Sequence, residues 1–429
     1  MSAIRWFSAA LLACGALAAC DALFGQELNA KFCAAHPDDV QCRVDASPSQ
    51  GCSSSVECVA PLVCDVMGTQ TCVACTLAEP AACTGTTPVC GGDHLCHGCA
   101  SHAECLGSGV CLPDGSCADA GQVAYVEPAP GGSDNTRCTL TMPCTKVASA
   151  LQAVRPYVKI SGTNDEGGTI TIDNRYVTLL GGSDAKLTRT SIGLHVEVKG
   201  TSEVQIQDLE ISGALGAQGV GISMPTGNTA KLTLQRVKLT NNTGGGISAN
   251  GGTLTINQST ISGNTGGGLS VTNAEFEIVN SLIVKNGSPS SSYGGVVLSQ
   301  INTGTRRFEF NTIVQNQTTS GITPGVLCLA VGTMLTLTNA IVYDNGTGLQ
   351  VEGPNCEWSY SDIGPMAVAG TGNLNSAPQF VNPAQADFHL QSGSPAKDAA
   401  DLEASLAIDI DGDPRPQGAA RDMGADEIR

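Results

Sequence analysis

The sequence predicts a mostly β protein in which a solenoid of stacked β-coils follows a set of small, disulfide-rich modules. Three observations predict this fold class. A segment of about 22 residues recurs in the second half of the 429-residue chain, and 18 of the 20 cysteines lie before residue 145. Glycine occurs 52 times, whereas aromatic residues make up only 4% of the chain, which favours short strands and tight turns over a helical bundle.

The recurring segment begins with alternating apolar residues. Three copies, LTLQRVKLTNN, LTINQSTISGN and FEIVNSLIVKN, open at Leu232, Leu254 and Phe276, each 22 residues after the last. Alternation with a period of two indicates a strand, and a fixed period of this length indicates one coil of a stacked solenoid. A further full copy, LTLTNAIVYDN, opens at Leu335, whereas a shorter copy opens at Phe308 and a degenerate one at Val204.

Each of the clearer copies ends in an asparagine, at Asn242, Asn264, Asn286, Asn316 and Asn345. We interpret this asparagine structurally, because its side chain tolerates a left-handed backbone and can hydrogen-bond its neighbours in stacked coils. A ladder of ligand-binding asparagines is the alternative interpretation.

The pattern resembles the right-handed parallel β-helix family, which includes pectate lyases and many bacterial surface proteins. The resemblance covers about 125–429 and implies a β-helix over 123–370, with its first strand at 123–126. Apolar residues recur at helical spacing in 145–154, so we expect a capping helix at the amino-terminal end. The tail, with the motifs DFHL, GSPA, DIDGDP and DMGADE, resembles that of surface members of the family. We therefore expect residues 371–429 to form a C-terminal cap over the last coil.

The first 19 residues have the features of a signal peptide, with Arg5 before a short apolar run. The run ends in Leu17-Ala18-Ala19-Cys20, which resembles the lipobox of bacterial lipoproteins. The resemblance implies that Cys20 carries a lipid, that 20–51 form the anchor and a spacer, and that the chain lies in the cell envelope, in the outer membrane or at the cell surface. An ordinary signal peptide that leaves Cys20 free is the alternative.

Twelve cysteines in 52–117 form three consecutive sets of four. The sets resemble the cysteine-rich repeats of bacterial surface lipoproteins. Because a repeat of about two dozen residues is too small to build a hydrophobic core, we expect disulfides to hold it together. The pairing cannot be read from the sequence. The candidate disulfide cysteines of the whole chain are Cys33, Cys42, Cys52, Cys58, Cys64, Cys72, Cys75, Cys83, Cys90, Cys96, Cys99, Cys105, Cys111, Cys117, Cys138, Cys144, Cys328 and Cys356.

Two CxxC pairs in this region would also fit a zinc site, since His94, His97 and His102 lie close to them in the sequence. An exported chain meets an oxidising environment, which favours disulfides over zinc. The net charge of −18 and the pI near 4.6 repel phosphate backbones, so we expect no nucleic-acid partner.

Neither of the usual catalytic constellations of this fold stands out in the coils. Lyases need clustered carboxylates for calcium and an Arg or Lys as base, and hydrolases need a pair of carboxylates. If a catalytic site exists, the candidate residues are Glu275, Glu277, Glu309 and Arg306. His195 is the only histidine of the coils, and we interpret it as a packed residue. The sequence therefore assigns no catalytic residue.

The tail offers one weak metal motif. Asp409, Asp411 and Asp413 alternate, so their carboxylates could converge on calcium. In the rival interpretation, Arg415 and Arg421 pair with these acids inside the cap. The sequence suggests no other cofactor.

Three functions fit these features. The one that we favour is a non-catalytic, envelope-anchored surface protein for adhesion or polysaccharide binding, attached to the membrane through its lipid. A polysaccharide lyase or glycoside hydrolase is the first alternative, and it depends on fold analogy alone. A structural spacer of the envelope is the second.

Overall fold

The computed structural model describes residues 51–79, 82–300, 304–329, 332 and 334–429. The predicted signal peptide, the lipidation of Cys20, and the candidate disulfide cysteines Cys33 and Cys42 lie outside the described residues. The chain divides into two compact units, Met1–Cys105 with Cys111–Cys117, and Leu106–Val110 with Ala118–Arg429. Within the described residues, no helix is long and apolar enough to cross a membrane.

The described residues of the first unit form small disulfide-bonded modules, as predicted. In each set of four cysteines the first pairs with the third and the second with the fourth. The bonds are Cys52–Cys64, Cys58–Cys72, Cys75–Cys90, Cys83–Cys96, Cys99–Cys111 and Cys105–Cys117. The regular elements are η1 (Ser55–Glu57), β1 (Val63–Cys64), β2 (Cys72–Val73), β3 (Val89–Cys90), β4 (Cys96–His97) and η3 (His102–Glu104). Since no cysteine of the described residues is free, none of them offers a thiolate for zinc.

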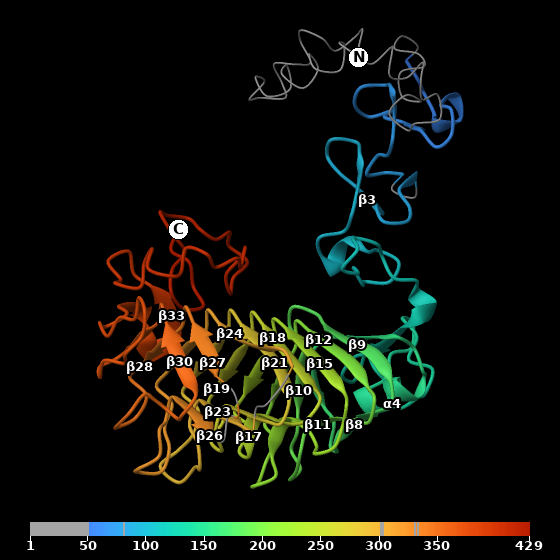
Figure 1. The fold of residues 1–429 in the computed structure, drawn as a ribbon. Helices are drawn as coiled ribbons and strands as arrows, with labels where there is room; N and C mark the ends of the chain where they lie inside the picture. The colour runs from blue at the N-terminus through green and yellow to red at the C-terminus, as the bar shows by residue number, and fades with distance from the viewer. Residues whose placement is uncertain (1–50, 80–81, 301–303, 330–331, 333) are drawn as a thin grey trace, which may run out of the picture. The chain divides into compact units, whose positions relative to one another are not determined.

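The second unit is a β-helix built from three parallel sheets, of ten, nine and eight strands in the described part of the chain (Figure 1). Each coil passes from sheet 1 to sheet 2 to sheet 3. Sheet 1 contains β5 (Val123–Val126), β6 (Tyr157–Ile160), β9 (Tyr176–Gly181), β12 (Glu203–Gln207), β15 (Lys231–Gln235), β18 (Thr253–Asn257), β21 (Glu275–Val279), β24 (Arg306–Glu309), β27 (Leu335–Thr338) and β30 (Cys356–Ser359).

Every strand of sheet 2 is three residues long: β7 (Thr163–Asp165), β10 (Lys186–Thr188), β13 (Glu210–Ser212), β16 (Lys238–Thr240), β19 (Thr260–Ser262), β22 (Leu282–Val284), β25 (Thr312–Val314), β28 (Ile341–Tyr343) and β31 (Asp362–Gly364). Sheet 3 contains β8 (Ile170–Asp173), β11 (Val196–Lys199), β14 (Val220–Met224), β17 (Gly245–Asn250), β20 (Leu269–Thr272), β23 (Val296–Ser299), β26 (Val326–Leu329) and β29 (Val351–Glu352).

The apolar positions of the sequence repeat form the core of the solenoid. Leu232 lies in register with Leu254, and Leu254 with Phe276, so the first residue of each copy stacks on its counterpart. All three are fully buried. Full burial of such a side chain contributes about 1.5–3 kcal/mol, and the repetition of these rows stabilises a long solenoid with few aromatic residues.

The repeated asparagines form a buried ladder along the corner after sheet 2. Asn264 Nδ2 donates to Asn286 Oδ1 at 2.9 Å, and Asn286 Nδ2 donates to Asn316 Oδ1 at 3.0 Å. The left-handed backbone falls on the residue before each asparagine, for example Asn241 with φ 54°. Asn242 itself, fully buried, makes the stacked hydrogen bonds. The ladder is therefore structural.

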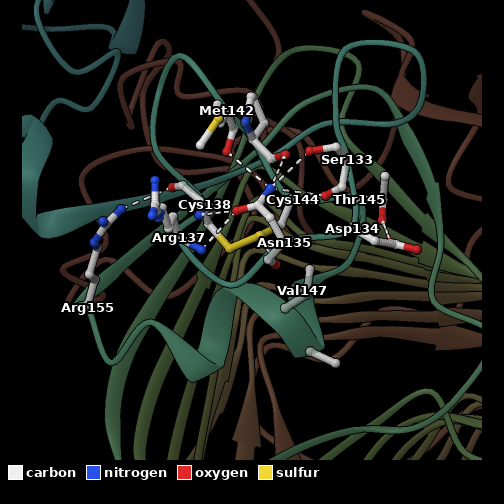
Figure 2. Close-up of a disulfide and its surroundings, with 12 residues drawn as sticks. Ser133, Asp134, Asn135, Arg137, Cys138, Met142, Cys144, Thr145, Val147 and Arg155 are labelled. Carbon is white, nitrogen blue, oxygen red and sulfur yellow. Dashed lines mark hydrogen bonds between the residues drawn. A yellow bond between two sulfur atoms is a disulfide. The ribbon is translucent and has the colours of Figure 1, made fainter.

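A short helix and a disulfide-bonded loop close the amino-terminal end. The helix α4 (Val147–Gln152) buries Val147, Ala150 and Leu151 against the first coils. Glu166 Oε1 accepts a hydrogen bond from the backbone N–H of Val147 at 2.7 Å, which satisfies one free donor of the helix start. The preceding loop, after η4 (Ala120–Gln122) and β5, is closed by Cys138–Cys144 (Figure 2).

The sequence led us to expect that residues 371–429 form a cap over the last coil. In the structure most of this segment lies elsewhere. Only its first part extends the last coil, where Leu374 pairs with Asp362. The rest, with β32 (Phe380–Asn382), η5 (Pro383–Gln385) and β33 (Asp387–Leu390), packs along the outer face of sheet 2. There the Ala425 N–H donates to Thr312 Oγ1 at 3.0 Å. The cause is a row of apolar residues that point outward from this part of sheet 2 and need cover.

Candidate functional site

The amino-terminal half of the outer face of sheet 2 carries an open groove of about 390 Å³. It lies over β10, β13 and β16, beside the corner that joins sheet 1 to sheet 2. Its lining residues are Thr163, Gly182, Ser183, Asp184, Ala185, Lys186, Asp208, Leu209, Glu210, Arg236 and Lys238. Charged side chains of both signs therefore dominate it.

Two ion pairs organise the groove. Lys186 Nζ lies 2.8 Å from Glu210 Oε1. Arg236 forms a bidentate pair with Asp208, its Nε donating to Oδ1 at 2.6 Å and its Nη2 to Oδ2 at 2.8 Å. Arg236 is thereby held in a fixed, planar orientation at the edge of the groove.

The register of the coils brings these charges together. Lys186 pairs with Glu210, and Glu210 with Lys238, in successive strands of sheet 2. Asp208 and Arg236 occupy the same corner position two residues earlier, both with left-handed φ values of 54° and 53°. Charges of alternating sign thus stack along the groove.

The carboxyl group of Glu210 stays ionised at neutral pH. Burial opposes ionisation, but hydrogen bonds from Lys186 and Thr240 and the charge of Lys238 outweigh it and lower the Glu210 pKa. A catalytic general acid needs the opposite shift, a raised pKa that keeps its proton. The geometry suits an acceptor of hydroxyl hydrogen bonds instead.

One lysine beside the groove has an unusually low pKa. Lys159, on the outer face of β6, donates from Nζ to Gly181 O at 3.0 Å. Burial lowers its pKa to about 8, against the opposing effect of the Asp208 charge. A lysine of this kind can accept a proton near neutral pH.

The acidic residues that the sequence offered for catalysis lie on a different face, the outside of sheet 1. Glu277 and Glu309 come together around Arg307, whose Nη1 lies 2.9 Å from Glu277 and whose Nη2 lies 2.7 Å from Glu309. Arg307, and not the candidate Arg306, therefore bridges the two acids. Glu275 is the first residue of β21 and lies beside Gly304. Because Arg307 holds both carboxylates, the cluster resembles a surface ion-pair network more than a hydrolase pair.

His195 is fully buried and lies directly before β11, which begins at Val196. Burial, with a smaller effect of the Arg189 charge, lowers its pKa to about 4. It is a packed, neutral histidine of the solenoid.

The three aspartates of the weak calcium motif have separate partners. Asp409 Oδ1 accepts hydrogen bonds from the backbone N–H groups of Asp411 and Asp413, at 2.9 and 2.8 Å. Asp413 pairs with Arg429, and Asp411 with His389. The three do not occur together among the possible metal-binding groups of the described residues. The rival arginine pairing is not seen either, since Arg415 pairs with Glu427 at 3.1 Å and Arg421 Nε donates to Leu406 O at 2.9 Å.

One comparison with known proteins agrees with the fold. A family model described as the right handed beta helix region matches residues 194–358. Among solved structures, the crystal structure of pectate lyase Pel9A is similar, with a TM-score of 0.45 and 14% identity, over 72% of this chain and 96% of that chain. No curated protein matches. The three parallel sheets and the family match define the second unit as a right-handed β-helix, and the activity must be argued from its surface.

Sequence reasoning missed the groove, although a signal was present. When the copies VQIQDLEIS and LTLQRVKLT are aligned, Asp208 stands opposite Arg236 and Glu210 opposite Lys238. Opposite charges at the fifth and seventh positions of neighbouring copies predict contacts between coils, because equal positions stack in a solenoid.

Proposed function

We propose that this chain is a non-catalytic surface protein, anchored in the bacterial envelope by a lipid on Cys20, that binds polysaccharide through the groove on sheet 2. The observation that carries the proposal is the groove itself, an open surface with fixed donors and acceptors in alternation. Sugar rings present many hydroxyl groups that both donate and accept, and a row of alternating charges can satisfy both roles.

The state of the charges supports binding rather than catalysis. Asp208 and Glu210 are each held by a cation, at 2.6 and 2.8 Å, and the lowered pKa of Glu210 makes this carboxylate an acceptor of hydrogen bonds. Preformed polar groups reduce the entropy lost when a ligand binds.

An extracytoplasmic location is consistent with the eight disulfides of the described residues, because such bonds persist in oxidising environments. The lipid anchor depends on the lipobox-like sequence alone. Labelling with a radioactive fatty acid, in the wild type and in a Cys20→Ala variant, tests it. Label that persists in the variant would contradict the anchor.

A glycan array tests the binding, using residues 21–429 with and without calcium. Bound glycans should be eluted intact. Lys238→Ala should weaken binding at the groove, whereas Lys231→Ala should not. Lys231 is a matched control, since it is an exposed lysine of the same coil on sheet 1. Equal binding by the two variants would place the ligand elsewhere, and no binding by the wild type would favour the structural spacer.

One observation favours a second candidate function, that of a polysaccharide lyase. It is the lowered pKa of Lys159 beside the groove. A lysine with a pKa of about 8 can act as the base that removes a proton from a sugar carbon. If the eluted glycans are cleaved to unsaturated products, Lys159→Gln should abolish the cleavage, since an amide side chain is not a base, and should leave binding intact.

A further inference from the structure

A histidine in the C-terminal segment lies among three carboxylates. His389, on β33, has its Nδ1 2.5 Å from Asp387 Oδ1 and its Nε2 2.8 Å from Asp411 Oδ2. A carboxylate oxygen of Asp426 completes a group in which one ligand atom each of His389, Asp411 and Asp426 lies within 4.8 Å of the others. The imidazole ring is half exposed, at 50%, so the group opens to solvent.

Bonds made by other atoms hold these side chains in place. The turn that carries Asp411 is fixed by Asp409, whose Oδ1 accepts from the backbone N–H of Asp411 at 2.9 Å. Asp426 is 8% exposed, and its Oδ2 accepts from the Leu390 N–H at 2.7 Å. Within the described residues, the other Asp426 oxygen has no hydrogen bond, which leaves it available to a ligand.

The local charges do not balance. His389, even when protonated, carries one positive charge against the three negative charges of Asp387, Asp411 and Asp426. The neighbouring arginines already have partners, since Arg429 pairs with Asp413 and Arg415 with Glu427. Burial raises the pKa of Asp426, so this carboxyl group takes up either a proton or a further positive charge.

We propose that His389, Asp411 and Asp426 form a binding site for a divalent transition-metal ion, for which Zn²⁺ is the representative. In this site Nε2 releases to solvent the proton that it shares with Asp411, its lone pair and one oxygen of each carboxylate become the three protein ligands, and water completes the coordination. Asp387 is a positioning residue. It accepts the Nδ1 proton, which fixes the tautomer that presents Nε2 to the metal.

The imidazole decides the class of metal. Calcium and magnesium prefer oxygen ligands throughout, whereas imidazole nitrogen favours zinc, cobalt, nickel and copper. The weak calcium motif of the sequence therefore contributes a single ligand, Asp411, to a site of different chemistry. A bound ion would join β33 to the 409–413 turn and to the end of the chain, and would stabilise the folded C-terminal segment by mass action.

Titration of the metal-free chain with Co²⁺ and Zn²⁺ tests the proposal. Cobalt reports its ligands through its visible absorption, and zinc binding is measured by calorimetry. We expect one ion per chain, with visible bands for cobalt, and no competition from calcium. His389→Gln should weaken binding by at least about tenfold, and Asp387→Asn by about 10- to 100-fold as the loss of an outer partner.

His97→Gln is the matched control, because His97 forms a similar exposed pair with Asp93 at 2.9 Å. Its metal binding should equal that of the wild type. Asp411→Asn is a second test, since this half-exposed side chain can change without disturbing the core. Binding weaker than about 1 mM, or binding that survives both His389→Gln and Asp411→Asn, would overturn the site.

Discussion

The outer face of sheet 2 has two halves with the same strand geometry, but only one of them is covered by the C-terminal segment. In both halves the strands are three residues long and stack in register. The amino-terminal half is open and carries the groove, whereas the carboxy-terminal half lies beneath the residues after 377. A single row of outward positions runs through both: Lys186, Glu210, Lys238, Thr260, Leu282, Thr312, Ile341 and Asp362.

The chemistry of this row explains the difference. It begins with charged residues, passes through Thr260 and becomes apolar at Leu282 and Ile341. Val284, Val314 and Ile341 pack with Phe388 and Met423 of the C-terminal segment. The outward positions of the repeat thus determine whether the face stays open or is covered by the C-terminal segment, while the inward positions keep the same core.

Removing Arg415 should break the covered half most severely. Arg415 and Glu427 form an ion pair in which both side chains are fully buried, and the guanidinium lies 4.6 Å from the centre of the Phe310 ring. Arg415→Ala leaves a buried carboxylate without its cation, so the free energy of unfolding should fall by about 3–5 kcal/mol. Urea denaturation measures it.

The exposed Arg429 provides the control for this prediction, because Arg429→Ala removes only a surface pair with Asp413 and should leave stability unchanged. The double variant Arg415→Met with Glu427→Leu should recover part of the loss, since it removes both members of the buried pair. If Arg415→Ala is as stable as Arg429→Ala, the ion pair does not hold the cap.

Two substitutions in the same row should separate the halves. Ile341 is fully buried under the cap, so Ile341→Ala should lower the free energy of unfolding by about 2–5 kcal/mol. Thr260→Ala, in the row before it becomes apolar, should change it by about 0.5 kcal/mol or less. Thermal and urea unfolding of both variants measure the difference. Equal effects would mean that the cap does not bury this row.

Asp362, at the end of the row, should make the covered half sensitive to pH. It is fully buried, and this burial raises its pKa to about 7, against an opposing effect of the Ser376 N–H. The folded state therefore favours the protonated form. Its contribution is complete below the pKa of the unfolded chain, about 4, and is lost as pH rises toward 7, with a slope of at most about 1.4 kcal/mol per pH unit.

Asp362→Asn keeps a neutral side chain of similar shape at every pH. The variant should lose this slope and become more stable than the wild type at pH 8, which stability curves measured from pH 4 to 8 would show. A wild type and variant with parallel curves would contradict the raised pKa.

The solenoid could be predicted from the sequence because its signal repeats. Leu232, Leu254 and Phe276 recur at one spacing, and the same residues form the stacked core. The disulfide-bonded modules could be predicted for the same reason, since four cysteines recur in each. Their pairing could not, because every pairing within a set of four is compatible with the spacing.

The candidate sites depend on contacts that no period describes. The group around His389 includes Asp411 and Asp426, which lie 22 and 37 positions later in an irregular segment. Only the folded chain brings these residues together. The position of the C-terminal cap could not be predicted from the sequence either. The sequence showed that Leu282 and Ile341 lie in strands, but it did not show that their side chains face outward. Every residue of these two short strands is apolar, so no alternation of polar and apolar residues marks the outer face.

A small effect on stability should come from the open half, where we propose that the charges bind a ligand. Lys186 and Glu210 are both about one-third exposed, at 34% and 28%, so solvent screens their pair. Lys186→Met should change the free energy of unfolding by less than about 1 kcal/mol, while polysaccharide binding falls because a donor disappears from the groove. Urea denaturation and glycan binding, measured on the same preparation, separate the two quantities. A large loss of stability with unchanged binding would mean that the charges of the open half support the fold, as the apolar residues of the covered half do, and the contrast between the halves would disappear.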